Sequence, residues 1–487
     1  MSEIDYKKLK FKSGLEIHQQ LDANGKKLFC DCPAVLRSDE ADFEVERKLH
    51  AVAGESGDVD KAAEYQSALK KVFVYNVYND NNCLIDIDEE PPHEVNQEAL
   101  KIALQIALLL NCKIIPITQI MRKTVVDGSN TSGFQRTVLI ARDGFVETSL
   151  GRVGIDTICL EEDSARKIKT SSEGGIEKVH YNIDRLGIPL VEIATAPDIT
   201  SGGQAKEVAL HIGDVLRSCK VRRGIGTIRQ DVNISIMNEN RVEMKGVQDM
   251  RIFEKVIENE VLRQKELHDA KKPTDAEVRN ALPDATSEFL RPMPGADRMY
   301  PETDLPLLKI SRDFINECKK DLPKLRSDIA GELKDKGLSE EMIKLLLKMD
   351  KVDEFKDLLN LYDNIHFVAK LMLLFPKEIA SKEGKSFDEV EELLGDFYGD
   401  ILRLLNEKKI HEGDVKDIMI KLVRGEEFKD SIKIEKVDSS EIEGEILKII
   451  KSKPGLNPNA YMGLVMSQMK GKVNGKEVMD IIGKLIK

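Results

Sequence analysis

Long apolar runs are missing from this 487-residue sequence. No stretch approaches the roughly 20 residues that a helix needs to cross a membrane. A signal peptide is not expected either, because the chain opens on the polar residues Met1-Ser-Glu-Ile-Asp5. These absences predict a cytoplasmic protein without a membrane partner.

Cysteine is scarce, with seven residues scattered over the chain. An odd, dispersed set does not suit a disulfide framework. Cys30, Cys32 and Cys83 occur in polar segments with His93 nearby, and these four side chains could form a structural zinc site. Their irregular spacing equally fits unrelated side chains, so zinc is one of two open alternatives. The other cysteines have apolar or helical neighbours and are predicted core residues: Cys112, Cys159, Cys219 and Cys318.

Complete nucleotide-binding and hydrolase motifs are missing as well. Gly384-Lys-Ser386 ends like a phosphate-binding P-loop but lacks the upstream glycine. Gly224-Ile-Gly226 continues to Arg229 where a dinucleotide-binding loop needs a third glycine. No Gly-x-Ser-x-Gly nucleophile elbow occurs. If the protein handles a phosphate compound, it does so by a less common arrangement.

The chain carries more acid than base, with 86 Asp and Glu against 74 Lys and Arg and a formal net charge of -12. This balance argues against strong, non-specific binding of nucleic acid by the whole protein. It leaves room for a local basic surface. The segment 448–487 provides one, since its eight lysines face only two acids, Glu477 and Asp480.

The order of the patterns predicts an α+β protein with three domains. Residues 1–307 have many short strand patterns and few helices, which favours a mixed α/β domain with a largely antiparallel sheet over a doubly wound one. Asn96 before the apolar stretch 99–110 predicts a capped and buried helix. Residues 308–437 have the periodicity of a helical domain, and residues 438–487 that of a small helical tail domain.

Three acidic segments adjoin strand-like residues. In Gly14-Leu-Glu-Ile-His-Gln-Gln-Leu21, alternation puts Glu16 and His18 on one face of a strand. Glu162 and Glu192 occur in two later strand-like segments. Carboxylates from separate strands suit Mg²⁺ or Mn²⁺, which prefer oxygen ligands. The same spacing also fits ordinary surface acids.

Two polar segments offer cations for phosphate groups. Arg122 and Lys123 precede the glycine-rich segment 127–133, whose backbone amides could bind an anion. Arg291 and Arg298 belong to a proline-rich, polar stretch that suits a site loop better than a core. A solvent-exposed loop without a ligand is the alternative for the glycine-rich segment.

A series of motifs follows in order along nearly the whole chain: Gly14-Leu-Glu-Ile-His-Gln-Gln-Leu21, Lys27-Leu-Phe-Cys-Asp-Cys32, Asp88-Glu-Glu-Pro-Pro-His93, Asp127-Gly-Ser-Asn-Thr131, Leu160-Glu-Glu-Asp163, Asp184-Arg-Leu-Gly-Ile-Pro-Leu-Val-Glu192, Arg229-Gln-Asp-Val-Asn-Ile-Ser235, Phe289-Leu-Arg-Pro292 and Met299-Tyr-Pro-Glu-Thr-Asp304. Together they resemble the GatB/GatE family of tRNA-dependent amidotransferase subunits. The paired glutamines after Glu-Ile-His and the Glu-Glu-Pro-Pro-His stretch favour its GatE branch.

The resemblance implies an α+β "cradle" domain, a helical domain and a tail domain similar to YqeY. It implies an ATP-dependent carbon–nitrogen ligase of the glutamine-hydrolysing type that acts on misacylated Glu-tRNA(Gln). The glutamyl carboxylate is first phosphorylated by ATP with Mg²⁺, and ammonia then displaces the phosphate to give Gln-tRNA(Gln). The implied partner is an asparaginase-type protein similar to GatD, which supplies ammonia in a heterotetramer with two copies of each chain.

The resemblance also implies roles for particular residues. The implied Mg²⁺ ligands, which also count as catalytic residues, are Glu16, His18, Glu162 and Glu192. The implied cationic groups are Lys123, as a further catalytic residue, and, for the ATP phosphates, Arg122, Arg291 and Arg298. The implied contacts with tRNA are Lys470 and Lys472 in the basic tail.

The chain departs from the GatE pattern in one place. GatE proteins usually carry an insertion similar to a domain of bacterial aspartyl-tRNA synthetase, and between Val261 and Pro283 no room remains for it. Two other functions stay open. One is a GatB-type subunit that works with an amidase in a three-subunit Asp/Glu-tRNA amidotransferase. The other is a tRNA-binding scaffold without catalytic activity.

Overall fold

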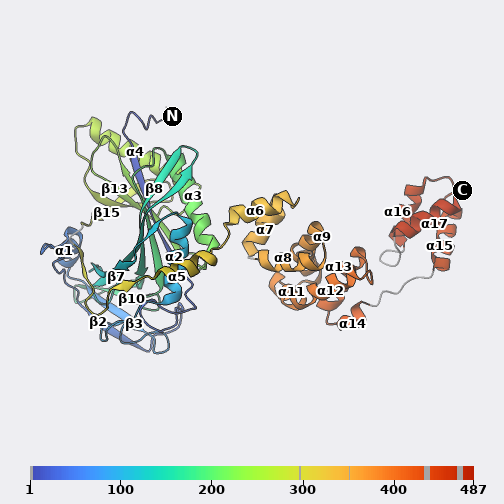
Figure 1. Cartoon of the computed structure of the whole chain (residues 1–487), viewed down its shortest axis with the longest axis horizontal. Helices are drawn as coiled ribbons and strands as arrows, with labels where there is room; N and C mark the ends of the chain where they lie inside the picture. The colour runs from blue at the N-terminus through green and yellow to red at the C-terminus, as the bar shows by residue number, and fades with distance from the viewer. Residues whose placement is uncertain (1–3, 296–297, 350, 433–438, 469–474, 487) are drawn as a thin grey trace. The chain divides into compact units, whose positions relative to one another are not determined.

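The computed structural model describes residues 4–295, 298–349, 351–432, 439–468 and 475–486. The chain divides into two compact units, Met1–Arg326 and Ser327–Lys487, which Figure 1 colours from blue to yellow and from yellow to red. Of the helices in the described ranges, none has both the length and the apolar character that a membrane crossing requires.

The first unit is built around a large and mostly antiparallel sheet. Its described strands are β1 (Lys12–Gln20), β2 (Phe43–Arg47), β3 (Val72–Val77), β4 (Lys113–Ile114), β5 (Ile117–Thr118), β6 (Ile120–Thr124), β7 (Phe134–Thr148), β8 (Gly151–Glu162), β9 (Arg166–Glu173), β10 (Ile176–Asn182), β11 (Pro189–Thr195), β12 (Ile228–Ser235), β13 (Val242–Lys245), β14 (Glu277–Ala281), β15 (Ser287–Pro292), β16 (Met299–Pro301) and β17 (Leu308–Lys309). The large sheet has the order β15-β14-β13-β12-β1-β11-β8-β7-β6-β16, with β4 paired to β7. Strands β2, β3, β10 and β9 form a second sheet.

Helices cover one face of the large sheet. The described helices of this unit are α1 (Lys61–Ala68), α2 (Gln97–Leu109), α3 (Gly202–Ser218), α4 (Phe253–Asp269) and α5 (Arg312–Lys320). Helix α2 begins after Asn96, whose side chain accepts a hydrogen bond from the backbone N–H of Ala99. Helices α2, α3 and α4 share one core with the apolar side chains of the strands, and Figure 1 shows α2 and α3 lying along the sheet.

Alternation along the strands decides which side chains enter that core. Leu15 and Ile17 of β1 are buried in it, as are Val191 and Ile193 of β11. Successive side chains of a strand point to opposite faces, so Glu16, which lies between Leu15 and Ile17, points away from the helices. The burial of the apolar face stabilises the layers and leaves the opposite face for polar groups.

The second unit is helical. Its described helices are α6 (Arg326–Asp335), α7 (Glu340–Met349), α8 (Val352–Leu361), α9 (Ile365–Leu373), α10 (Phe375–Glu383), α11 (Phe387–Leu394), the short 3₁₀ turn η2 (Gly395–Phe397), α12 (Tyr398–Asn406), α13 (Glu412–Val423), α14 (Phe428–Ser431), α15 (Ser439–Ser452), α16 (Pro458–Gln468) and α17 (Gly475–Leu485). Two separate cores lie within this unit, one in α6–α14 and one in α15–α17.

The α+β fold class with a largely antiparallel sheet and a helical C-terminal region is confirmed, as is the predicted helix cap at Asn96. Helix α5 belongs to the first unit, because Cys318 packs in its core and Gln105 of α2 donates to the carbonyl of Asp321 at 2.8 Å. The helical sequence pattern therefore begins before the boundary at Arg326. The division at residues 307 and 437 stays a prediction.

Candidate functional site

Antiparallel register brings the candidate residues of β1 and β11 together. His18 of β1 pairs with Glu192 of β11, and Glu16 lies two residues earlier on the same face of β1. The Nε2 atom of His18 is 3.3 Å from Oε2 of Glu192 and 3.6 Å from Oε1 of Glu16. Three of the four implied Mg²⁺ ligands are therefore in contact in the folded chain.

Lys123 of β6 reaches the same group from the other side. Its Nζ donates to Oε1 of Glu161 at 2.6 Å and to Oε2 of Glu192 at 3.2 Å. Lys123 and Glu161 are both buried. Buried charges of opposite sign offset the cost of removing one another from water when they are hydrogen-bonded. We call Glu16, His18, Lys123, Glu161 and Glu192 the carboxylate cluster.

The cluster sets its carboxylates at different proton affinities. Burial acts to raise the pKa of Glu192, but the charges of Lys123 and His18 outweigh burial and hold that pKa well below its usual range. Burial acts to lower the pKa of His18, but the hydrogen bond and charge of Glu192 outweigh it and raise that pKa. Burial and repulsion from Glu192 raise the pKa of Glu16. Glu16 therefore takes up a proton more readily than Glu192.

Two overlapping sets of donor atoms in and beside the cluster could hold a cation. His18, Glu161 and Glu192 each offer a ligand atom within 4.8 Å of the others, and so do Glu16, His18 and Asp231. Asp231 of β12 pairs with Glu16 in the sheet. Carboxylate oxygens dominate both sets, which suits Mg²⁺ or Mn²⁺ better than a metal that prefers sulfur.

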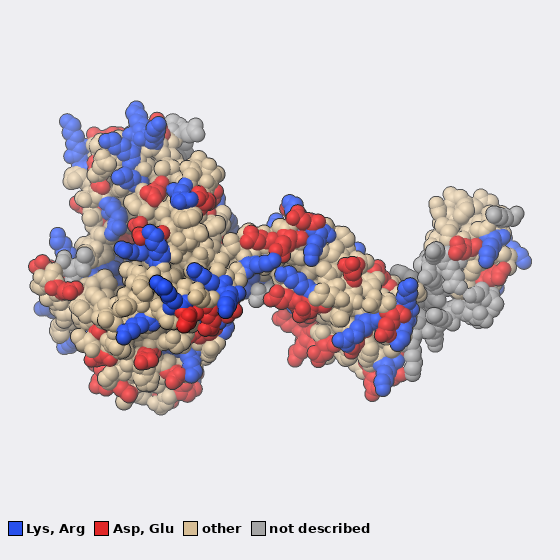
Figure 2. All heavy atoms as spheres, viewed as in Figure 1, with Lys and Arg blue, Asp and Glu red and all other residues tan. Residues whose placement is uncertain are grey.

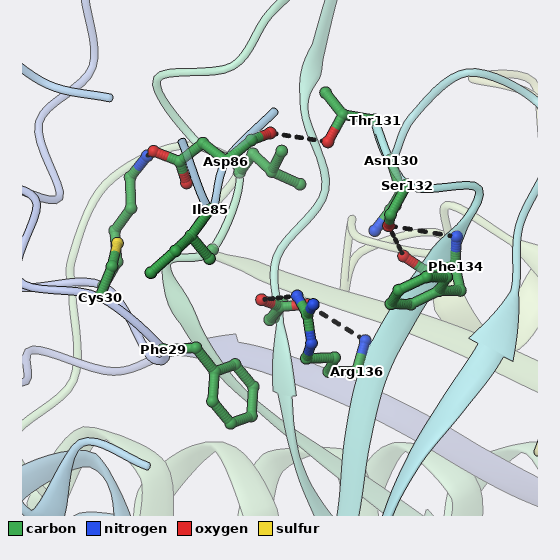
Figure 3. Close-up of a pocket in the computed structure, with 13 residues that line it drawn as sticks. Phe29, Cys30, Ile85, Asp86, Asn130, Thr131, Ser132, Phe134 and Arg136 are labelled. Carbon is green, nitrogen blue, oxygen red and sulfur yellow. Dashed lines mark hydrogen bonds and ion pairs between the residues drawn. The ribbon is translucent and has the colours of Figure 1, made fainter. Parts of the chain in front are cut away.

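Glu162 does not join this cluster, unlike the grouping expected from the sequence. Its side chain lies on the opposite face of β8, where its two carboxylate oxygens accept hydrogen bonds from the backbone N–H of Arg136 at 3.1 Å and from its guanidinium at 3.3 Å. The guanidinium also donates to Glu302 at 2.8 Å. Figure 3 shows Arg136 in the pocket that Glu162 lines. Glu161, the preceding residue, contacts Lys123 instead.

The cysteines converge at one side of that pocket. Cys30, Cys32, Cys83 and Asp86 have ligand atoms that all lie within 4.8 Å of one another, and Figure 3 shows Cys30 and Asp86 on the same wall. Within the described part of the chain this set has Asp86 as its fourth member, whereas His93 is exposed. The three predicted cysteines are thus brought together and the predicted histidine is not.

Arg122 is held by acids rather than free for a ligand. Its guanidinium donates to both carboxylate oxygens of Glu302, at 2.6 and 3.0 Å, and to Asp304 at 3.1 Å. It also lies over the ring of Phe134, 4.5 Å from the centroid. These contacts fix the arginine beside Lys123 and indicate a role in positioning the strand.

Arg291 and Arg298 line a small cavity together with the backbone segment 124–127. Arg298 is near enough to Lys123 for its charge to act against protonation of that ammonium. Both arginines therefore stay candidates for an anion. Lys470 and Lys472 lie outside the described residues. On the face that Figure 2 shows, basic side chains of the first unit are interspersed with acidic ones.

Sequence reasoning missed three residues of these groups. Glu161 and Asp231 belong to motifs that were recognised, but the strand face of each residue was not assigned. The signal was present in the alternation, because Leu160 is a core residue and Glu161 must then point to the polar face. Asp86 had no comparable signal, since it reaches the cysteines from a turn after β3.

Known proteins match the chain over its full length. The pattern of the GatB/GatE catalytic domain matches residues 11–316. A relative from Methanocaldococcus jannaschii, named as the E subunit of glutamyl-tRNA(Gln) amidotransferase, is 35% identical over 637 aligned positions that cover 100% of both chains. Relatives of the same name are 33% identical in Methanococcus vannielii, with 97% of each chain covered, and in Methanosarcina barkeri, with 99% of each covered.

These matches also bear on the insertion that the sequence lacks. The alignment with the M. jannaschii relative has 637 positions against 487 residues here, so that relative contains segments without a counterpart in this chain. In the structure, residues 270–276 connect α4 directly to β14. From its catalytic-domain pattern and its full-length relatives, this chain belongs to the GatB/GatE family.

Proposed function

We propose that this chain is the tRNA-binding subunit of a glutamyl-tRNA(Gln) amidotransferase and carries out both chemical steps of the reaction. The observation that supports this best is the carboxylate cluster, where one ammonium, one imidazole and three carboxylates from different strands meet on the polar face of the sheet. A scaffold that only bound tRNA would have no use for such a buried arrangement of charges. The names of its full-length relatives supply the substrate class.

In the first step, an oxygen of the tRNA-bound glutamyl carboxylate attacks the γ-phosphorus of ATP, and ADP leaves. Both reactants are anionic, so a positive charge must lie between them to offset their repulsion. Lys123 provides an ammonium group at that position in the cluster. Arg291 and Arg298, which line the neighbouring cavity, would bind the phosphate oxygens of ATP.

In the second step, the nitrogen of ammonia bonds to the acyl carbon and the bond from that carbon to the phosphate oxygen breaks. The nitrogen must then lose a proton. Glu16 is suited to accept it, because burial and repulsion from Glu192 raise the pKa of its carboxyl. The products are Gln-tRNA(Gln) and inorganic phosphate.

The donor atoms of the cluster fit Mg²⁺. Glu16, Glu161 and Glu192 supply three carboxylates against the single ammonium of Lys123, so the group is short of positive charge. Bound there, Mg²⁺ would neutralise phosphate oxygens and hold them for in-line attack. His18 suits an outer position better, because Mg²⁺ prefers oxygen to imidazole.

Ammonia must come from another protein of the complex. The relatives are named as one lettered component of an amidotransferase, which indicates an assembly of several different chains. We infer an asparaginase-type partner similar to GatD, in a cytoplasmic heterotetramer with two copies of each chain. The GatB-type assembly, in which an amidase and a small third protein take this place, is the alternative. The partner that co-purifies with the chain distinguishes the two.

The activity can be tested with the purified complex. We expect Gln-tRNA(Gln) to form from Glu-tRNA(Gln), ATP and an amide donor, with one ADP released per amide bond, and we expect removal of Mg²⁺ by a chelator to stop both. The measurement is separation of the aminoacyl groups after deacylation of the tRNA. Binding of tRNA without any ADP release by the complete complex would instead support a scaffold.

We also propose that Cys30, Cys32, Cys83 and Asp86 hold a structural zinc ion. Three thiolates and a carboxylate are zinc ligands, and tetrahedral coordination needs donor atoms as close as these are. Asp86 already accepts a hydrogen bond from the buried ammonium of Lys27 at 2.9 Å, which orients its carboxylate. The ion would tie the segment after β1 to the turn after β3.

Metal analysis of the purified chain tests this site. We expect about one zinc per chain, as for a structural site, with loss of that zinc and a lower melting temperature in Cys83→Ser. His93→Ala is the matched control and should keep the metal, because His93 is exposed. Zinc-free wild-type protein, or loss of zinc in the control, would contradict the assignment.

A further inference from the structure

A short loop projects from the large sheet beside the carboxylate cluster. Residues 220–222 pair with the end of β1 through backbone hydrogen bonds. Strand β12 then resumes the pairing with Ile228 opposite Gln19. Between these two stretches residues 223–227 leave the sheet. The next position of the register places Arg229 opposite His18.

The base of this loop is fixed by hydrogen bonds. The buried side-chain amide of Gln19 donates to the carbonyls of Arg222 at 2.9 Å and Thr227 at 3.1 Å. The hydroxyl of Thr227 donates to the carbonyl of Gly224 at 2.8 Å and closes the turn. Because one side chain from the core face of β1 holds both ends of the loop, the loop is presented in one position.

The tip of the loop is an isoleucine between two glycines. Ile225 is 109% exposed, the highest value among the large apolar side chains of the described ranges, and Leu150 follows with 62%. Gly224 and Gly226 have φ angles of 121° and 82°, which other residues seldom adopt. A Cβ on either glycine would meet no described atom within 4 Å. The fold therefore holds a whole apolar side chain out in water, which marks a contact surface.

The surroundings of the tip suit a nucleic acid strand. Lys220, Arg222, Arg223 and Arg229 all lie within a few residues of Ile225, and a cluster of basic groups attracts a phosphate backbone. The base of the loop is two residues from His18 along β1, which is about 7 Å in a strand. The part of a tRNA that comes this close to the carboxylate cluster is its unpaired 3′ end, which carries the amino acid.

We propose that Ile225 packs against an unpaired base at the 3′ end of the tRNA and so directs the glutamyl group into the carboxylate cluster. This inference rests on the proposed function. Apolar side chains pack against base faces without reading sequence, and the basic residues around the loop hold the backbone. Ile225 is thus a positioning residue rather than a catalytic one.

A binding experiment with two RNA probes tests the proposal in the complex with its ammonia-supplying partner. One probe is a tRNA(Gln) transcript with its complete 3′ end, and the other is the same transcript without the unpaired 3′ nucleotides. We expect wild-type protein to bind the complete transcript about tenfold more tightly, in keeping with the usual effect of stacking on one base. In Ile225→Ala this ratio should fall to about two, and Ile225→Phe should restore it.

Leu150→Ala is the matched control, because Leu150 is exposed at the turn between β7 and β8, and it should keep the wild-type ratio. An unchanged ratio in Ile225→Ala would overturn the proposal while leaving the proposed function intact. So would an unchanged ratio combined with loss of the co-purifying partner, which would show that the tip contacts a protein. If the wild-type complex amidated no Glu-tRNA(Gln) and bound neither transcript, the proposed function and this inference would fall together.

Discussion

The variant Glu192→Gln is expected to lower the rate of Gln-tRNA(Gln) formation by about a thousandfold, the usual scale for loss of a central electrostatic group. Glu192 contacts both His18 and Lys123, so its charge holds the two sides of the cluster together. Glutamine keeps the shape but removes the charge that orients Lys123 and helps to bind Mg²⁺. The measurement is kcat for amidation by the full complex.

Affinity for tRNA is the control for this variant. The carboxylate of Glu192 lies within the sheet and is about 15% exposed, so its loss should leave the Kd for tRNA(Gln) unchanged. A second control is circular dichroism, which should show the same secondary structure. A variant with normal amidation and normal affinity would contradict a catalytic role for the carboxylate cluster.

The adjacent variants Glu161→Gln and Glu162→Gln are expected to behave differently. Glu161→Gln should lower kcat by roughly a hundredfold or more, because Glu161 binds Lys123 at 2.6 Å. Glu162→Gln should leave kcat within about tenfold of wild type and lower the melting temperature, because it breaks a buried pair with Arg136. Each variant removes one negative charge from one strand, so each is the control for the other.

The pair therefore separates the two faces of β8. Single-turnover amidation measures the chemical step, and thermal unfolding of the same preparations measures stability. A large loss of rate in Glu162→Gln with normal stability, together with a normal rate in Glu161→Gln, would show that the second glutamate of the motif reaches the reacting groups. That result would contradict the assignment made here and agree with the grouping expected from the sequence.

Much of the architecture could be predicted from local patterns. Alternation in β1 placed Glu16 and His18 on one face, and the apolar stretch after Asn96 predicted the buried helix α2. These predictions succeeded because period and capping depend on neighbouring residues alone. The end of the first unit was less accessible, because α5 reads as helix in either unit and only its packing against α2 assigns it.

The two candidate sites show where such reasoning stops. Three cysteines were grouped correctly, but their fourth partner is Asp86 rather than His93. Both residues lie close to Cys83 in the sequence, and only the turn after β3 decides which of them points inward. Likewise Ile225 reads as an ordinary residue of a glycine-containing loop, and its exposure follows from hydrogen bonds made by the distant Gln19.

The sequence by itself determined the fold class, the family and the strands that supply the carboxylate cluster, because these depend on residue type, order and local periodicity. Only the tertiary structure decided that Glu161 rather than Glu162 contacts Lys123. The physical reason is that a strand gives adjacent residues to opposite faces. Which face meets the helices is settled by burial of Leu160 and its apolar neighbours across the whole sheet.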